Sequence, residues 1–269
     1  MDRNMVQVSE EKWEQLKAAR TSLAERGSSP RKISLESRMT IINWNYLWGY
    51  TSSSIIQDRL GRTSGGYGNK LAAQGWLTAT KTESGIPRVF YTLTEMGLQE
   101  AERYAPELYR YPESDPYRVN QKLLRHNLLA QKITIDAIRS GLISGFETER
   151  MLAKKGDKSG VKRPDVVLIT TNKLRIGIEV ELSAKWARDL DDFVLGIVRA
   201  LDSTTHESNF SRFTIASDSP AIIDRYKKAM APGARLNTWV KNQRNHWVVD
   251  KTIMVPDWLI LKIDFQLIG

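Results

Sequence analysis

The sequence predicts a mixed α/β protein in two parts, a helical part that carries a β-hairpin and a part in which strands and helices alternate. Three observations predict this class. Apolar residues recur at helical spacing before residue 105, alternating runs at 76–82 and 88–93 flank a Gly-Ile-Pro turn, and strand-like runs such as 166–170 alternate with helix-like runs after residue 120.

The first part contains short helices, several of which end at a glycine. A linker is expected at 27–32, where Gly and Pro disfavour a helix and small polar residues favour a turn. The runs 76–82 and 88–93 form a hairpin. Five helices are expected around these features, at residues 9–26, 38–48, 51–60, 64–74 and 94–103.

From residue 35 onward, this order of three helices, a hairpin and a helix is that of a winged helix-turn-helix. In such a unit the helix at 64–74 enters the major groove of DNA and the hairpin lies along the backbone. Residues 105–118 contain three Pro and three Tyr, which sustain neither a helix nor a central strand. We therefore expect a helix and linker at 1–34, the winged helix at 35–104, a hinge at 105–119 and an α/β domain at 120–269.

The second part begins with a long helix at 120–140 and then alternates between strands and helices. Helices are also expected at 184–201 and 220–230. The strands are expected at residues 145–152, 166–170, 174–182, 212–216, 238–240, 247–249 and 258–265.

Composition narrows the function classes. The 40 Lys and Arg outnumber the 31 Asp and Glu, a net charge of +9 that favours a polyanionic partner such as DNA. The absence of Cys excludes a thiol nucleophile, a disulfide framework and Cys-ligated zinc, and three scattered His argue against a His-rich metal site. No apolar run approaches the length of a membrane span and no signal-peptide core is present, so we expect a cytoplasmic protein without membrane insertion.

The strongest motif is a set of carboxylates on two successive strands. Alternate residues of a strand share a face, so Glu179 and Glu181 project together while Ile178 and Val180 point into the core. Asp165 begins the preceding strand, which a short turn folds back beside them. Hard oxygen ligands of like charge suit Mg²⁺ or Mn²⁺, and the sequence therefore predicts a divalent-metal site. A solvent-exposed polar strand face is the alternative.

The same residues carry a resemblance. Pro164-Asp165, thirteen residues and then Glu179-x-Glu181 on an apolar strand before a helix resemble the PD-(D/E)XK core of restriction-endonuclease-like nucleases, with Glu181 in place of the usual Lys. That replacement, after a winged helix, is similar to the MobC-type (MOBC) relaxases. The resemblance spans most of residues 35–215 and implies a restriction-endonuclease-like fold for 120–269.

The resemblance also implies an activity: metal-dependent nicking of one DNA strand at a transfer origin (oriT) to start conjugative mobilisation of a plasmid or mobile element. It implies Asp165, Glu179 and Glu181 as metal-binding catalytic residues, and Lys185 as a displaced cationic group. Glu147 and Glu149 are possible further ligands. Cleavage by water needs no protein nucleophile, whereas a covalent route would use one of the hinge tyrosines, Tyr104, Tyr109, Tyr111 or Tyr117.

Basic side chains predict the DNA contacts, with both duplex and locally single-stranded DNA at the origin as partners, and a coupling protein of a conjugation system beyond them. The loop 154–163 carries five Lys or Arg just before Asp165 and is expected to hold phosphates. The basic, aromatic turn at 241–247 either stacks on unpaired bases or is a plain surface hairpin. The DNA-binding candidates are Arg59, Arg62, Asn69, Lys70, Lys81, Arg88, Lys162 and Arg163.

Other interpretations stay open at this point. The missing Lys leaves room for a non-catalytic DNA-binding accessory protein or replication-relaxation-type regulator with a decayed nuclease domain. A restriction or repair nuclease would cut both strands and form a symmetric dimer. A winged helix that binds protein is a further alternative. His126 is expected to pack within its helix and not to act in the site.

Overall fold

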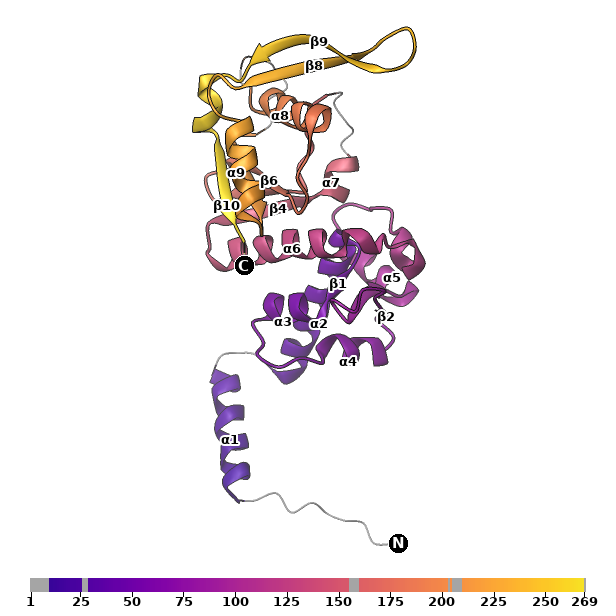
Figure 1. Cartoon of the computed structure of the whole chain (residues 1–269). Coiled ribbons are helices and arrows are strands. Elements are labelled where there is room, and N and C mark those ends of the chain that lie inside the picture. The colour runs from indigo at the N-terminus through magenta and orange to yellow at the C-terminus, as the bar shows by residue number, and fades with distance from the viewer. Residues whose placement is uncertain (1–9, 26–28, 155–159, 203, 205–209, 269) are drawn as a thin grey trace.

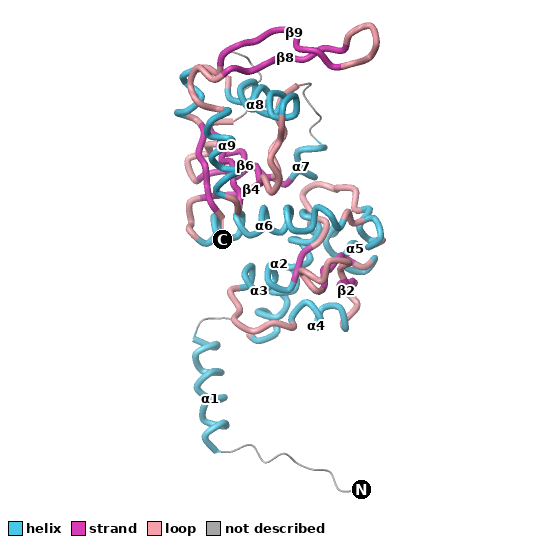
Figure 2. Tube along the Cα trace, in the orientation of Figure 1, coloured by secondary structure: helices cyan, strands magenta, loops and turns pink. Residues whose placement is uncertain are grey.

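The computed structural model describes residues 10–25, 29–154, 160–202, 204 and 210–268. Its described part mixes helices and strands, which confirms the predicted α/β class. Figures 1 and 2 show the N-terminal helices and a small sheet at one end, a larger sheet at the other, and helix α6 between them. None of the described helices combines the length and the apolar character that a membrane crossing requires.

The N-terminal part follows the expected order, with one helix longer than predicted. Helix α2 begins at Pro30 and not at residue 38, because Pro fits the first helical position and the Ser29 hydroxyl accepts a hydrogen bond from the Lys32 amide. Residues 27 and 28 of the expected linker lie outside the described residues. The elements are α1 (Glu10–Glu25), α2 (Pro30–Trp48), β1 (Thr51–Ser52), α3 (Ser53–Leu60), α4 (Tyr67–Ala73), β2 (Leu77–Lys81), β3 (Val89–Leu93) and α5 (Glu95–Tyr104).

The small sheet has the strand order β1-β3-β2, all antiparallel. The predicted hairpin is present as β2 and β3, with Leu77 opposite Leu93. Strand β1 was not expected, because its two residues lie in the predicted helix 51–60; Ser52 instead accepts a hydrogen bond from the Ile55 amide and caps α3. A core of α2, α3, α4 and hairpin side chains, such as Ile42 and Leu71, holds these elements together.

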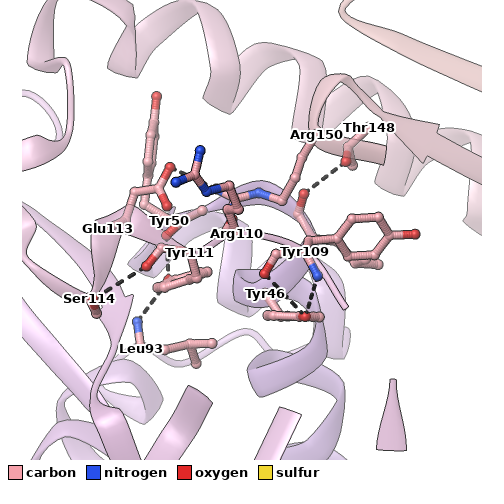
Figure 3. A network of polar contacts seen from close by, with 12 residues as sticks. Tyr46, Tyr50, Leu93, Tyr109, Arg110, Tyr111, Glu113, Ser114, Thr148 and Arg150 are labelled. Carbon is pink, nitrogen blue, oxygen red and sulfur yellow. Dashed lines mark hydrogen bonds and ion pairs between the residues drawn. The ribbon is translucent and has the colours of Figure 1, made fainter. Parts of the chain in front are cut away.

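Residues 105–123 form an irregular strap with three short 3-10 turns, η1 (Pro112–Ser114), η2 (Pro116–Arg118) and η3 (Gln121–Leu123). The strap is anchored by its tyrosines. The buried Tyr111 hydroxyl donates to the Gly49 carbonyl and accepts from the Leu93 amide, and the Tyr109 amide donates to the Tyr46 hydroxyl (Figure 3). The domain boundary here stays a prediction, but its chain is packed onto α2 and β3.

A buried glutamine fastens the two parts together. Gln131 of α6 is fully buried, and its amide donates to the Tyr50 carbonyl at 2.9 Å. Its side-chain oxygen accepts from the Trp44 indole at 2.7 Å and from the Thr51 hydroxyl at 3.0 Å. Because buried polar groups are costly to leave unpaired, all three bonds favour one fixed arrangement of α6 against α2 and β1.

The larger sheet has the order β10-β7-β6-β5-β4. Strands β4, β5 and β6 are antiparallel neighbours, whereas β7 runs parallel to both β6 and β10. The elements of this part are α6 (Leu124–Arg139), β4 (Ile143–Thr148), α7 (Glu149–Lys154), β5 (Val166–Thr170), β6 (Arg175–Val180), α8 (Ala187–Leu201), β7 (Arg212–Ser217), α9 (Pro220–Ala229), β8 (Arg235–Lys241), β9 (Trp247–Met254), η4 (Asp257–Leu261) and β10 (Ile263–Leu267).

Two hydrophobic clusters cover the sheet. On one side α6 packs against Val166, Ile178 and Val180, as the alternation in β6 predicts. On the other side α8 and α9 pack against Phe213 and Ile215 of β7. Gly177 of β6 belongs to this second side, where a Cβ would lie 2.7 Å from the Phe213 ring, so only glycine admits that ring.

Two predicted strands are partly helical. The strand expected at 145–152 ends at Thr148, whose hydroxyl donates to the Leu47 carbonyl in the N-terminal part, and α7 follows. The strand expected at 258–265 begins only at Ile263, because the 3-10 helix η4 follows Pro256 and occupies Asp257–Leu261. Strands β8 and β9 are longer than expected and form a separate hairpin that projects beyond α8 (Figure 1).

Candidate active site

Asp165 lies at the point where β5 begins beside the end of β6. Its amide donates to the Ile178 carbonyl, and its side chain accepts a hydrogen bond of 2.8 Å from the Val180 amide. The second partner of this carboxylate is His126 of α6, with 3.2 Å between Nε2 and Oδ2. Backbone and side-chain bonds therefore fix Asp165 at the sheet edge that also bears Glu179.

Glu179 is the most unusual carboxyl group of the site. It is 1% exposed, and its Oε2 lies 2.9 Å from Nζ of Lys162. Its Oε1 is buried and has no hydrogen-bond partner. Burial, together with the nearby Asp165 charge, raises the pKa of Glu179 well above its usual value despite Lys162. Leaving a buried oxygen without a partner is costly, which sets Glu179 apart from the other acids of the site.

Glu181 follows β6 directly and shares the face of Glu179. It is 5% exposed, its amide donates to the Ala216 carbonyl at 2.8 Å, and its side chain contacts Lys185 four residues later. Tyr226 of α9 lies close by, and burial followed by the Glu181 charge raises the pKa of its hydroxyl. The charges of Asp165 and Glu181 thus both act on Glu179. The strand alternation predicted that the two glutamates share a face.

Two lysines complete the cluster from the α8 side. Nζ of Lys162 and Nζ of Lys185 lie 5.5 and 4.6 Å from the ring centre of Phe193, a buried residue of α8. The Lys162 amide donates to the Gly196 carbonyl, where an added Cβ would lie 3.0 Å from Lys162 Cβ. Burial lowers the pKa of Lys162, but the Glu179 charge and hydrogen bond outweigh it and the net shift is upward. Lys162 is therefore held as a cation against Glu179, and Lys185 contacts Glu181.

His126 lies in the site and does not serve only for helix packing. Its Nδ1 lies 2.8 Å from Oδ1 of Asn127 and its Nε2 faces Asp165. Burial lowers the pKa of His126, but the hydrogen bond and charge of Asp165 outweigh it and raise the pKa to about 9. Sequence reasoning missed this role because α6 and β5 are distant in the chain and only the fold brings them together.

The donor set fits a hard divalent cation in its chemistry. Across the described residues, no three His, Asp or Glu side chains are grouped as a ready coordination shell. The three carboxylates instead have Lys162, Lys185 and His126 as partners. The unpaired oxygen of Glu179 and the mutual repulsion of the acids are what a cation would relieve.

The additional acids are placed differently. Glu147 of β4 is paired with Arg175 of β6 at 2.6 Å and so belongs to a neighbouring ion pair. Glu149 begins α7 and lines a cavity of about 350 Å³ with Asp165, Arg163 and Tyr50. This cavity lies between α2, the strap, α6 and α7. Arg163 is therefore beside the carboxylates, as expected, while residues 155–159 of the basic loop lie outside the described residues.

The remaining DNA-binding candidates fall into two groups. Asn69 and Lys70 of α4 are exposed, although the Asn69 side-chain oxygen accepts a hydrogen bond from the Tyr91 hydroxyl at 2.8 Å. Arg62 is also exposed, and its guanidinium carbon lies 4.0 Å from the ring centre of Tyr67. The other two exposed candidates, at the ends of the hairpin turn, are Lys81 and Arg88.

Arg59 is placed apart from α4. Its side chain is half-buried, and its guanidinium lies 5.3 Å from the ring centre of Trp44 in α2, a residue that packs with Ile55 of α3 and Ile135 of α6. Burial, and then the nearby Arg139 charge, lower the pKa of Arg59. The structure thus places Arg59 in packing between the two parts.

The hinge tyrosines differ in their availability. Tyr111 is buried with both hydrogen-bonding functions of its hydroxyl used (Figure 3). The Tyr109 hydroxyl donates to Glu107. Tyr117 and Tyr104 are 94% and 62% exposed. No geometric relation marks any of the four as a nucleophile, so the covalent route gains no support from the described residues.

Comparisons with known proteins add no family assignment to this geometry. No protein-family model matches the chain, and neither the curated proteins nor the solved structures contain a significant match to it. Its function must therefore be inferred from the residues of the site and from the order of its strands and helices.

Proposed function

We propose that this chain is a divalent-metal-dependent DNA endonuclease that nicks one strand, a relaxase acting at a transfer origin. The observation that carries the proposal is Glu179, a buried acid with a raised pKa and an unpaired oxygen, coupled to Asp165 and Glu181 at one sheet edge. Acids with perturbed pKa values gather at functional sites more than elsewhere.

The arrangement of elements supports this proposal. In residues 124–217 helix α6 is followed by the antiparallel strands β4, β5 and β6, with the short helix α7 between β4 and β5. Helix α8 and strand β7, which is parallel to β6, come next. We infer a restriction-endonuclease-like domain from this order and from the carboxylates on its second and third strands. The order α2, β1, α3, α4, β2, β3 supports a winged helix that binds duplex DNA, with α4 as the recognition helix.

Each residue of the site then has a role. Asp165, Glu179 and Glu181 would hold Mg²⁺ or Mn²⁺, which when bound polarises the phosphate and offsets charge on the leaving oxygen. Lys162 and Lys185 would exchange their carboxylate partners for phosphate oxygens of the DNA strand. His126, 3.2 Å from Asp165, would orient that carboxylate. Asn69, Lys70, Lys81 and Arg88 would bind the duplex beside the origin, before a coupling protein receives the complex.

One observation favours a second candidate. Every carboxylate of the cluster already has a cationic partner, Lys162, Lys185 or His126, which is what a decayed nuclease domain would retain. In that case the chain would be a non-catalytic DNA-binding accessory protein, and the cluster would stabilise the fold.

Incubation with a supercoiled plasmid that carries the cognate origin separates the two. Wild-type protein should produce open circles with Mn²⁺ or Mg²⁺ and none with EDTA, and the double variant Glu179→Ala plus Glu181→Ala should produce none. The matched control is Asp264→Asn, an acid on β10 of the same sheet that pairs with Arg212 outside the cluster. Binding of the plasmid without any cutting would favour the accessory protein, and linear products would favour a nuclease that cuts both strands.

A further inference from the structure

An exposed tryptophan lies directly beside the carboxylate cluster. Trp186 is 66% exposed, although its neighbour Lys185 contacts Glu181 of the site. Trp186 therefore presents a large aromatic face to solvent next to the residue that contacts the cluster.

Arginine covers one side of this ring. The guanidinium carbon of Arg225 in α9 lies 3.3 Å from the ring centre of Trp186, and its Nε donates to the Lys185 carbonyl at 2.8 Å. The hydrogen bond holds the guanidinium in place, and the stacked guanidinium restrains the orientation of the indole ring. The pair is a preformed platform with positive charge behind it.

A second pairing of tryptophan with cations lies against the first turn of α8. Trp247, the first residue of β9, is 48% exposed, with Arg188 at 4.5 Å and Lys241 at 5.4 Å from its ring centre. Arg188 lies in the first turn of α8, only two residues after Trp186. The β8–β9 hairpin is held there because Asp191 of α8 accepts from the Trp239 indole at 2.8 Å.

Arg225 of the first platform also lines a cavity of about 690 Å³ between α8, α9 and β8. Lys228 and Arg235 line the same cavity. Two acids, Asp191 and Asp224, line it as well, and Asp191 is occupied by hydrogen bonds from Trp239 and Asn237. Three cationic side chains and two acids thus line the cavity that Arg225 shares with the first platform.

We propose that Trp186 and Trp247 form a stacking track for unpaired bases of single-stranded DNA, with Arg225, Arg188 and Lys241 binding its phosphates. Alternating aromatic rings and cations bind single strands with little sequence preference, because every base presents a π-face. A duplex hides these faces and would not use the track. This inference rests on the proposed function and deepens it, since it assigns the strand that leads into the nicking site to the surface beside α8.

Binding of a labelled oligothymidylate of roughly 20 nucleotides, longer than a typical single-strand site, tests the track. Fluorescence anisotropy in EDTA measures binding without cleavage. We expect Trp186→Ala to weaken binding by about 10-fold, and Trp186→Phe, which keeps a ring, to stay within about 3-fold of wild type. Trp247→Ala should act in the same direction. Trp13→Ala is the matched control, because Trp13 on α1 is 49% exposed and distant in sequence from the track.

The outcomes separate this inference from the proposed function. Wild-type affinity in Trp186→Ala, an equal loss in Trp13→Ala, or no binding of the oligonucleotide by the wild type would each overturn the track. The plasmid assay is read independently. If the wild type nicks the plasmid and Trp186→Ala binds the oligonucleotide normally, the track is contradicted and the nickase is supported. Loss of binding in Trp186→Ala without any nicking by the wild type would keep the track and remove the nickase.

Discussion

Lysines of the two parts of the molecule show how differently the same residue type can be used. Lys70 on α4 is exposed, and its Nζ lies 6.0 Å from the ring centre of Tyr67. Lys162 is half-buried, bonded to Glu179 at 2.9 Å and fixed to α8 through its amide. An exposed charge costs the fold little and remains available to a partner, whereas a buried one is part of a coupled set. Changes at α4 should therefore alter binding alone, and changes at the cluster should alter stability or chemistry.

The largest effect is expected for Asp165→Asn, which keeps an oxygen for the Val180 amide but removes a charge from the cluster. We expect nicking to fall by about 1,000-fold, because a cation bound by the full set is worth several kcal/mol to cleavage. Duplex binding should not change. The measurements are open-circle formation over time and gel-shift affinity for origin DNA. Nicking at the wild-type rate would show that Asp165 is not a catalytic residue.

The next largest effect is expected for Lys162→Met, which leaves Glu179 buried without its cation. The free energy of unfolding should fall by about 3 kcal/mol, the lower end for breaking a buried pair, because Glu179 can take up a proton. Chemical denaturation at neutral pH measures it. Lys70→Met is the matched control and should change stability by less than about 0.5 kcal/mol. Equal stability losses in the two variants would contradict the contrast between the two regions.

A smaller effect on binding is expected from the exposed charges. The double variant Lys70→Ala plus Arg88→Ala should lower duplex affinity by about 10-fold and reduce the salt dependence by about one unit per lost phosphate contact. Its unfolding free energy should match that of the wild type. Titrations at several salt concentrations measure both quantities. Unchanged affinity would show that α4 and the hairpin do not face DNA.

Arg59→Ala sharpens the comparison within the N-terminal part and has the smallest expected effect. Arg59 stacks on Trp44 between α3 and α6, so its loss should lower the unfolding free energy by about 1 kcal/mol. Duplex affinity should stay at the wild-type value. A loss of affinity like that of the double variant would restore Arg59 to the DNA surface.

Local patterns predicted the parts of this structure that depend on neighbours in sequence. The alternation around Ile178 and Val180 placed Glu179 and Glu181 on one face, and the helix expected at 94–103 is present as α5, which Thr94 caps. The glycine after α3 likewise marked its end. Periodicity and capping are local effects, and these elements follow them.

The rest depends on contacts between distant segments. His126 meets Asp165 only because α6 packs on β5 and β6, and Thr148 ends β4 by bonding to Leu47 about a hundred residues earlier. Trp186 was overlooked for a related reason. An isolated tryptophan in a sequence is usually part of a core, and only the stacked Arg225 and the 66% exposure show otherwise.

The three hydrogen bonds of Gln131 have a consequence for where a strand would be cut. They fix α6, which carries His126 of the site, to Trp44 of α2, to Tyr50 and to Thr51 of β1. If the chain nicks DNA as we propose, this fixed arrangement would set a constant distance along the double helix between the recognised sequence and the nick. Inserting roughly 5 base pairs, about half a helical turn, would rotate the nick site to the opposite face of the DNA, out of reach of the carboxylates.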